Sequence, residues 1–290
     1  MNSFDYFSPE TLSQACSLLA DTSRDARLLA GGTDVLIELR KPSAHAPGAL
    51  VDLSRIPELK GISETGDSVV IKPLATHTEI LRSDIIRRNA PLLRDAVSVI
   101  GSPQIRNRGT IGGNVMNSAA CADTVPPLMA LGAVLTLRSA TSQRAVALSE
   151  FYMKPYVTTA STGEILTEIR FKKLTPKTRS CFVKLGRRNA LSIARLSVAV
   201  VLRLDDKGLV EEARIVPGAA FPTWKRVAEA EAMLLGRIPS KEVCSQVGQK
   251  VSEMMIAITG RRWSTEYKEP VIAVLVRRAL EACLRPEGVV

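Results

Sequence analysis

The alternation of apolar and polar residues predicts short helices and strands in the first fifty residues. Between residues 12 and 19, apolar side chains recur at i, i+3, i+4 and i+7, the spacing of a helix with one buried face. The apolar run 28–30 stops at two glycines and is followed by the apolar run 35–39. This reads as a strand, a tight turn and a helix that ends before Pro42. With a further strand at 49–53, the pattern favours a small α/β lobe with some parallel pairing.

The middle of the chain mixes strands with helices in a less regular order. Strands are predicted where apolar residues alternate or run together, and helices where a helix-opening residue precedes an apolar stretch. The expected strands are 68–74, 133–138, 144–148 and 164–171, with a turn at 139–142; the expected helices open at 75–78, cover 90–100 and cover 128–131; loops are expected at 101–114 and 151–155.

The last part of the chain reads as a separate α+β domain. The segment 172–177 is basic, contains proline and lacks apolar periodicity, so it predicts a boundary. Beyond it we expect strands at 180–185, 197–204 and 210–216, a hairpin turn at 205–208, and helices at 226–235, 240–258 and 270–284. We place the domains at 1–175, with lobes of about 1–56 and 57–175, and at 178–287.

The composition fits a globular protein. The hydrophobic fraction is 46%, which is ample for a core, and the net charge is +10. The basic residues are scattered and not interleaved with aromatic residues, so most are expected to be solvated surface rather than a nucleic-acid site. A minority could face a cofactor phosphate or an acidic partner subunit. We see no membrane span and no signal peptide, and expect a cytoplasmic protein.

No catalytic or metal-binding residue can be assigned from the sequence. The count of five cysteines is odd and none form a CxxC pair, so we expect small buried apolar side chains rather than a disulfide framework or metal site. With only His45 and His77, a three-histidine zinc site is impossible. We find no nucleophile–base pair and no carboxylate pair at catalytic spacing. The cysteines are Cys16, Cys121, Cys181, Cys244 and Cys283.

Two glycine pairs carry the clearest chemical signal. Gly31 and Gly32 lie between a predicted strand and helix, and Thr33 or Asp34 is expected to cap that helix. Backbone N–H groups at such a turn suit an anionic phosphate, although an ordinary strand-to-helix turn looks the same. The segment 110–114 contains a second pair, and the two together could clamp a diphosphate. Neither matches the GxGxxG or GxxxxGK[ST] pattern, which argues against the usual dinucleotide and ATP folds.

Several stretches occur in the same order as in a known family. They are 29–34, 101–107, 110–114, 122–123, 164–166, 184–188, 264–268 and 277–280. On these residues the chain resembles the FAD-binding medium subunit of the molybdenum hydroxylases, which include enzymes similar to xanthine dehydrogenase and carbon monoxide dehydrogenase. The resemblance implies an α+β fold with a two-lobed FAD-binding domain (PCMH/vanillyl-alcohol-oxidase-like). A C-terminal α+β domain with a three-stranded antiparallel sheet and helices would follow.

The resemblance also implies an oxidoreductase role inside a complex. The cofactor would be FAD, and the partners would be a 2Fe–2S small subunit and a molybdopterin-binding large subunit, in a heterotrimer or a dimer of heterotrimers. Electrons would pass from the 2Fe–2S clusters to FAD and then to an external acceptor such as NAD, a quinone or oxygen. Neither nucleic acid nor a membrane span is expected.

The resemblance further implies which residues contact FAD. Asp123 would meet the polar chain of the flavin, Leu166 would approach the ring through its backbone, and Lys184 would supply a cation. The residues alone leave alternatives open: Asp123 could be a helix N-cap, and Lys184 a surface lysine at a strand edge. Ile100 departs from the family pattern, because some relatives carry a stacking aromatic there. The full expected set is Leu28, Leu29, Ala30, Gly31, Gly32, Thr33, Asp34, Val35, Ile100, Thr110, Ile111, Gly112, Gly113, Asn114, Asp123, Leu166 and Lys184.

Two other functions stay open at this point. A self-contained FAD-dependent reductase would need a proton-donating residue over the flavin, and none is identified. A basic non-enzymatic binding protein would need no cofactor. A flavin spectrum on the purified protein separates this last option from the other two.

Overall fold

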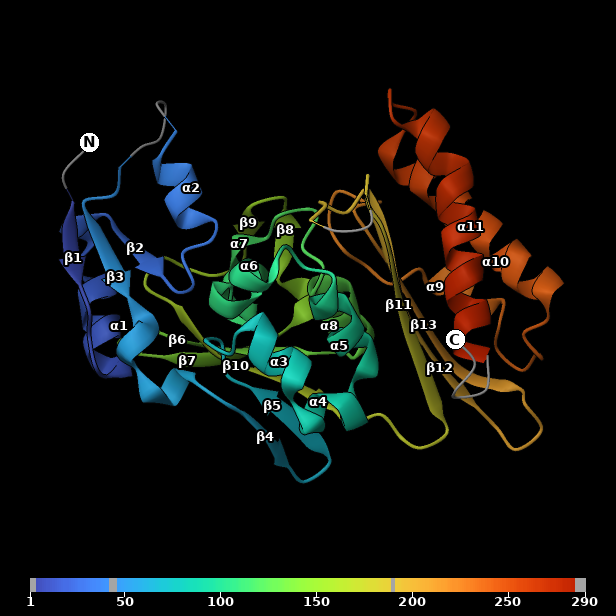
Figure 1. The fold of residues 1–290 in the computed structure, drawn as a ribbon, viewed down its shortest axis with the longest axis horizontal. Coiled ribbons are helices and arrows are strands. Elements are labelled where there is room, and N and C mark those ends of the chain that lie inside the picture. Colours follow the sequence, from blue (N-terminus) through green and yellow to red (C-terminus); the bar gives the residue numbers. More distant parts are fainter. Residues whose placement is uncertain (1–3, 42–45, 189–190, 285–290) are drawn as a thin grey trace.

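Three short parallel strands form the N-terminal lobe. The computed structural model describes residues 4–41, 46–188 and 191–284 (Figure 1). Strand β3 lies between β1 and β2 and pairs with both in parallel, so the predicted parallel α/β lobe is confirmed. Thr11 and Gln14 form a reciprocal cap that begins helix α1. The elements are β1 (Asp5–Phe7), α1 (Leu12–Ala20), η1 (Thr22–Arg24), β2 (Ala26–Leu29), α2 (Val35–Leu39), β3 (Ala49–Asp52), η2 (Leu53–Arg55) and η3 (Pro57–Leu59).

A five-stranded antiparallel sheet forms the middle of the molecule, in the order β4-β5-β10-β6-β7. Helices α3, α4, α5, α7 and α8 contribute buried residues to the same core as this sheet. All four strands predicted here are confirmed to within a few residues. The strands are β4 (Ile62–Thr65), β5 (Ser68–Ile71), β6 (Val134–Arg138), β7 (Gln143–Ala147), β8 (Tyr152–Lys154), β9 (Val157–Thr158) and β10 (Ile165–Lys172). The helices are α3 (His77–Arg82), α4 (Asp84–Asn89), α5 (Pro91–Ser98), α6 (Pro103–Arg108), α7 (Ile111–Asn117), α8 (Val125–Ala130) and η4 (Leu148–Glu150).

The two loops expected in this part were wrong. Segment 101–114 holds α6 and the first turn of α7, because Ser102 and Thr110 each cap a helix with the side-chain oxygen. Segment 151–155 contains β8, which pairs with β9. Helix α4 was not predicted, and α8 begins three residues before the expected 128 because its two prolines occupy the first turn.

The C-terminal domain contains a three-stranded antiparallel sheet that is buried on both faces (Figure 1). On β12, Val198 and Val200 pack with α10 and α11, whereas Ala199 and Val201 belong to the core of the middle sheet. This explains why β12 is a continuous apolar run. The elements are β11 (Thr178–Leu185), β12 (Leu196–Leu204), β13 (Val210–Gly218), α9 (Ala228–Ala232), α10 (Lys241–Thr259) and α11 (Thr265–Leu284).

The C-terminal strands and the antiparallel pairing confirm the prediction, but two helix bounds were wrong. Helix α11 begins at Thr265 and contains Pro270, which was expected to open it. Pro270 is therefore inside the helix, where it removes one backbone hydrogen bond and crowds the carbonyl four residues earlier, and it does not mark the helix start. Helix α9 is shorter than the expected 226–235.

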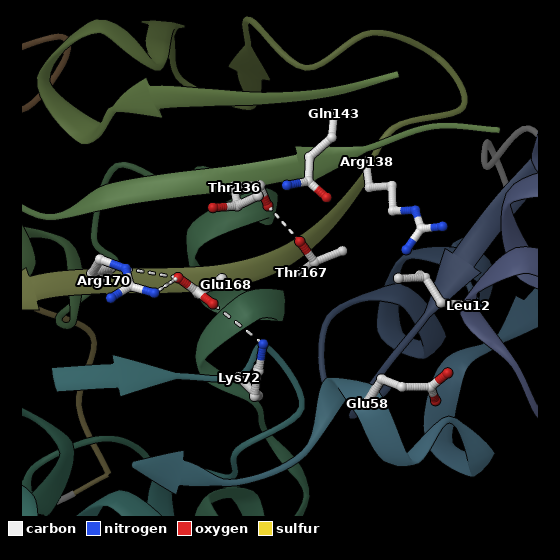
Figure 2. Close-up of a pocket in the computed structure, with 9 residues that line it drawn as sticks. All are labelled: Leu12, Glu58, Lys72, Thr136, Arg138, Gln143, Thr167, Glu168 and Arg170. Atoms are coloured by element: carbon white, nitrogen blue, oxygen red, sulfur yellow. Dashed lines mark hydrogen bonds and ion pairs between the residues drawn. The ribbon is translucent and has the colours of Figure 1, made fainter. Parts of the chain in front are cut away.

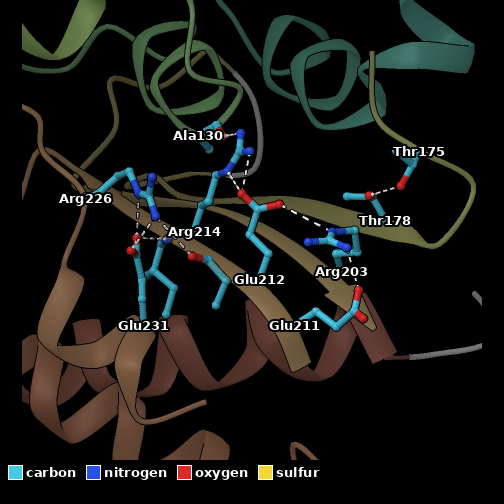
Figure 3. Close-up of polar contacts among 11 residues, drawn as sticks. Ala130, Thr175, Thr178, Arg203, Glu211, Glu212, Arg214, Arg226 and Glu231 are labelled. Carbon is cyan, nitrogen blue, oxygen red and sulfur yellow. Dashed lines mark hydrogen bonds and ion pairs between the residues drawn. The ribbon is translucent and has the colours of Figure 1, made fainter. Parts of the chain in front are cut away.

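Polar contacts also join the C-terminal sheet to the middle of the molecule (Figure 3). The Arg214 guanidinium donates to the carbonyl of Ala130 at the end of α8, at 2.8 Å, and pairs with Glu212 at 2.6 Å. Glu231 accepts hydrogen bonds from Arg226 and from the backbone N–H of Ile215, and so holds α9 to β13. Within the described ranges, no helix is long and apolar enough to cross a membrane.

Candidate cofactor site

The first glycine pair forms the turn between β2 and α2, as predicted. Gly32 has a φ of +76°, which favours glycine. A Cβ atom on Gly31 would lie 2.0 Å from the carbonyl oxygen of Arg108, so only glycine permits this approach of two backbones. Arg108 and Gly109 directly precede Thr110. The fold therefore brings the first glycine turn against the segment that leads into the second glycine pair.

The expected cap at this turn was wrong. Asp34 is the N-cap of α2, but its side chain makes no capping hydrogen bond, because its own backbone is already in the helical region. Burial raises the pKa of the Asp34 carboxyl, and the charge of Glu38 adds to the effect. Among the described residues, nothing accepts a hydrogen bond from the backbone N–H of Gly32, Thr33 or Asp34. These three donors are available to an oxyanion.

The second glycine pair differs, because its backbone donors are already used. The N–H of Gly112 donates to the carbonyl of Pro73 at 2.9 Å, and the N–H of Gly113 donates to Thr110 Oγ1 at 3.1 Å. A Cβ on Gly112 would lie 2.5 Å from Pro73, so this glycine is required for packing. A Cβ on Gly113 would meet only Thr110 Oγ1, at 3.0 Å. Gly113 therefore presents an open surface, whereas the free donors belong to the first turn.

Asp123 and Lys184 form a buried ion pair between the two halves of the chain. Lys184 Nζ lies 2.6 Å from Asp123 Oδ2, and each side chain is only 8% exposed. Lys184 also donates to the carbonyl of Val99 at 3.0 Å. The surface-lysine alternative for Lys184 was therefore wrong. The N-cap alternative for Asp123 was also wrong, because Thr124 occupies the N-cap position of α8.

The electrostatics of Asp123 are set by burial. Burial raises the pKa of its carboxyl from 3.8 to about 6, and Lys184 opposes part of this effect through its charge and hydrogen bond. Its second oxygen, Oδ1, is buried and has no hydrogen-bond partner in the described structure. A buried carboxylate oxygen without a donor is costly, so it is suited to accept a hydrogen bond from a bound hydroxyl group.

The remaining expected residues surround these groups or support them. Ile100 is half-buried, and its carbonyl accepts a hydrogen bond from Arg106 at 2.8 Å. Leu166 is buried in β10 opposite Leu137, beside a β-bulge and before the pairing with β5 begins at Ile169. Asn114 accepts a hydrogen bond from Thr124 at 2.6 Å, which ties α7 to the residue after Asp123. The others are packing residues around the first turn or in the core: Leu28, Leu29, Ala30 and Ile111. Val35 is half-buried and is the first residue of α2.

Two further residues lie beside these groups, and neither was expected to contact the cofactor. The pKa of the Cys121 thiol is raised by burial and then by the charges of Asp123 and Asp34, so this half-buried thiol lies near both carboxylates. Cys121 was expected to be a buried apolar side chain. His77 is buried against Gly109, and burial lowers its pKa to about 4. Its position after Thr76, the cap of α3, was visible in the sequence, but its contact with Gly109 was not.

These groups fit a cofactor with a diphosphate and hydroxyl groups, as FAD has. The free N–H groups of the first turn suit phosphate oxygens, the open side of Gly113 leaves room for close approach, and Asp123 Oδ1 suits a hydroxyl. Within the ranges that the structure describes, no group of three or more His, Cys, Asp or Glu side chains could hold a metal ion.

Comparison with known proteins shows the family to which the chain belongs. Residues 2–172 match the family described as the FAD-binding domain in molybdopterin dehydrogenase, and residues 181–283 match the carbon monoxide dehydrogenase flavoprotein C-terminal domain. The carbon monoxide dehydrogenase medium chain of Hydrogenophaga pseudoflava is 32% identical over 279 residues, covering 96% of each chain. The xanthine dehydrogenase FAD-binding subunit of Escherichia coli O157:H7 is 32% identical over 286 residues, covering 98% of this chain and 97% of the relative.

The fold of the chain also matches that of a solved structure. A solved structure of carbon monoxide dehydrogenase from Hydrogenophaga pseudoflava, which lacks the Mo-pyranopterin moiety of its molybdenum cofactor, superposes with a TM-score of 0.90 at 33% identity and 98% coverage of both chains. The predicted fold class and FAD as cofactor are thereby confirmed. The chain belongs to the family of FAD-binding subunits of molybdopterin dehydrogenases, which are oxidoreductases.

Proposed function

We propose that this chain is the electron-transferring flavoprotein subunit of a molybdenum-containing hydroxylase or dehydrogenase. FAD, held by the first glycine turn and Asp123, would supply the redox chemistry between 2Fe–2S clusters of a partner subunit and an external acceptor such as NAD. The observation that carries the proposal is the near-complete match, over 96% to 98% of the chain, to subunits named a medium chain and an FAD-binding subunit. The buried Asp123–Lys184 pair and the free N–H groups of the first glycine turn support it.

The residues of this chain would hold and orient the cofactor. The N–H groups of residues 32–34 would bind the diphosphate, and Asp123 would accept a hydrogen bond from a flavin hydroxyl. Lys184 would bring its positive charge to the site from the C-terminal domain, and its bond to the Val99 carbonyl would fix the segment that leads to Ile100. The wider contact set would be the seventeen residues expected from the sequence.

The partners would be a 2Fe–2S small subunit and a molybdopterin-binding large subunit, in a heterotrimer or a dimer of heterotrimers. We infer that the cluster-bearing partner docks on the N-terminal FAD-binding domain, near the flavin ring. The other side of the ring would then be open to the acceptor. The start of the C-terminal domain, with Lys184, Arg187 and Arg188, would cover part of that cleft.

Anaerobic reduction by substrate tests this proposal. The isolated chain, loaded with FAD, should keep its oxidised flavin spectrum when candidate aromatic heterocycles or aldehydes are added. The complex reconstituted with its partner subunits should bleach with the correct substrate. Bleaching of the isolated chain by substrate would instead favour a self-contained flavoenzyme.

A further inference from the structure

A polar pocket lies on the face of the middle sheet that is opposite the helices. On β6, Leu135 and Leu137 are buried in the core that the sheet shares with the helices. Thr136 and Arg138 alternate with them and therefore project from the other face. The cavity has a volume of about 490 Å³, and Leu12 and Glu58 of the N-terminal lobe form its second wall (Figure 2).

This pocket is separate from the candidate cofactor site. Leu166, which belongs to the expected FAD contacts, is buried in the core on the helix side of β10. Thr167, Glu168 and Arg170 of the same strand line the pocket. The sheet itself therefore lies between the pocket and the buried side chain of Leu166. Nothing in the proposed electron transfer uses these pocket residues.

The charges in the pocket do not cancel. Three cations and two carboxylates line it: Lys72, Arg138, Arg170, Glu58 and Glu168. Glu168 is already shared, because it lies 3.3 Å from Lys72 Nζ and 2.8 Å from the Arg170 guanidinium. Arg138 and Glu58 form no ion pair within the described part of the chain. Arg138 is thus a cation that faces the cavity without a neutralising partner.

The hydrogen-bonding groups are also mostly donors. Arg138 offers five N–H groups, and the Gln143 amide and Thr136 hydroxyl add further donors that no described side chain satisfies. Among the residues that the structure describes, Lys72 Nζ donates to Glu168 alone, at 3.3 Å, which leaves two of its N–H groups free. A cavity with a positive charge and an excess of donors favours an oxyanion, which accepts several charge-assisted hydrogen bonds at once.

We propose that this pocket binds a small, multiply charged oxyanion, a phosphate ester or a di- or tricarboxylate, with Arg138 as its main anchor. Glu58 stands on the opposite wall and opposes the binding of negative charge. A ligand held by Arg138 of the sheet and enclosed by the N-terminal lobe would also stabilise the packing of the two against each other. The two sources of the oxyanion differ in shape, so titrations with inorganic phosphate and with citrate separate them.

The test uses the FAD-loaded chain, or the whole complex, in a low-salt buffer without oxyanions. Isothermal titration with inorganic phosphate or with citrate should show saturable binding at one site per chain. Arg138→Gln should weaken binding roughly tenfold or more, the effect of losing one charge-assisted anchor. Glu58→Gln should tighten it, because a repelling charge is removed. Arg87→Gln is the matched control: this arginine lies on α4, is 64% exposed and should change nothing.

Several results would overturn the proposal. They are absence of saturable binding of both anions to the wild type, unchanged affinity in Arg138→Gln, an equal loss in Arg87→Gln, or weaker phosphate binding in Glu58→Gln. The flavin content and melting temperature of each variant show whether it is folded. Binding of phosphate alone would assign the site to phosphate esters, and binding of citrate alone would assign it to carboxylates.

Discussion

Replacing Asp123 by asparagine tests the proposed FAD contact directly. The change keeps the size of the side chain but removes its charge, and the orphaned Oδ1 shows where a ligand hydroxyl would donate. The asparagine oxygen can still accept the hydrogen bond, so the loss is the difference between a bond to a charged group, about 1.5 to 3 kcal/mol, and a neutral bond, about 0.5 to 1.5 kcal/mol. We therefore expect the Kd for FAD to rise roughly 5- to 13-fold. Titration of apoprotein with FAD, followed by flavin fluorescence, measures it.

The pH dependence provides an independent signature. The pKa of Asp123 is raised from 3.8 to about 6, so between these values the folded chain binds a proton that the unfolded chain does not. The free energy of unfolding should therefore fall as pH rises from about 4 to about 6, by roughly 3 kcal/mol, and then stay level. Because FAD needs the carboxylate, its affinity should rise with pH through this range in the wild type. In Asp123→Asn the affinity should be flat.

The control is Asp67→Asn, which removes the same charge from a 74% exposed side chain in the turn after β4. It should leave both FAD affinity and its pH profile unchanged. Wild-type affinity in Asp123→Asn, or a pH profile shared by both proteins, would refute the proposed contact. A loss of stability without a loss of FAD affinity would show that Asp123 serves only the ion pair with Lys184.

Three further predictions follow from the packing. Gly113→Val should remain folded but lose FAD, which the flavin content of the purified variant measures. Gly31→Ala should lower the free energy of unfolding by about 1–3 kcal/mol in urea, because the new Cβ overlaps the backbone of Arg108. Val200→Ala and Val201→Ala should each cost about 2 kcal/mol in urea unfolding, because β12 is buried on both faces, and a negligible cost for either would contradict that packing. Trp263→Ala should change the free energy of unfolding by less than about 0.5 kcal/mol, because the Trp263 side chain is 87% exposed. A larger loss would show that this side chain packs against the rest of the protein.

The sequence predicted the elements whose signals are local. The helix at residues 12–19 has a capping box and a clear apolar stripe, and it buries the four residues that the spacing indicated. The strands of the C-terminal sheet were found because β-branched runs end at a turn that contains glycine. Segment 101–114 was misread because its glycines suggested a loop. Ser102 and Thr110 are good N-cap residues, but an N-cap residue predicts a helix only when the residues after it can adopt helical backbone angles.

In the candidate site, too, the sequence predicted the local features and missed those that depend on contacts between distant segments. The first glycine turn was predicted because strand, turn and helix are adjacent in sequence. The use of the Gly112 donor by Pro73 depends on a contact between segments about 40 residues apart, and local patterns do not encode it. The burial of Lys184 against Asp123, 61 residues away, likewise requires the two domains to pack together. The roles of both residues were suggested by family resemblance, and their pairing came only from the fold.

The geometry of the candidate cofactor site depends on how the two domains pack together. The face of β12 that carries Ala199 and Val201 belongs to the same core as α5 and α8, so the C-terminal sheet acts as an inner layer of the FAD-binding half. Lys184 stands on the neighbouring strand, and its ammonium group joins Asp123 and the Val99 carbonyl. Apolar burial contributes most of the free energy that holds the domains together, and the ion pair fixes their relative position at the cofactor site. Substitutions at the apolar interface between the domains should therefore change FAD affinity by moving Lys184.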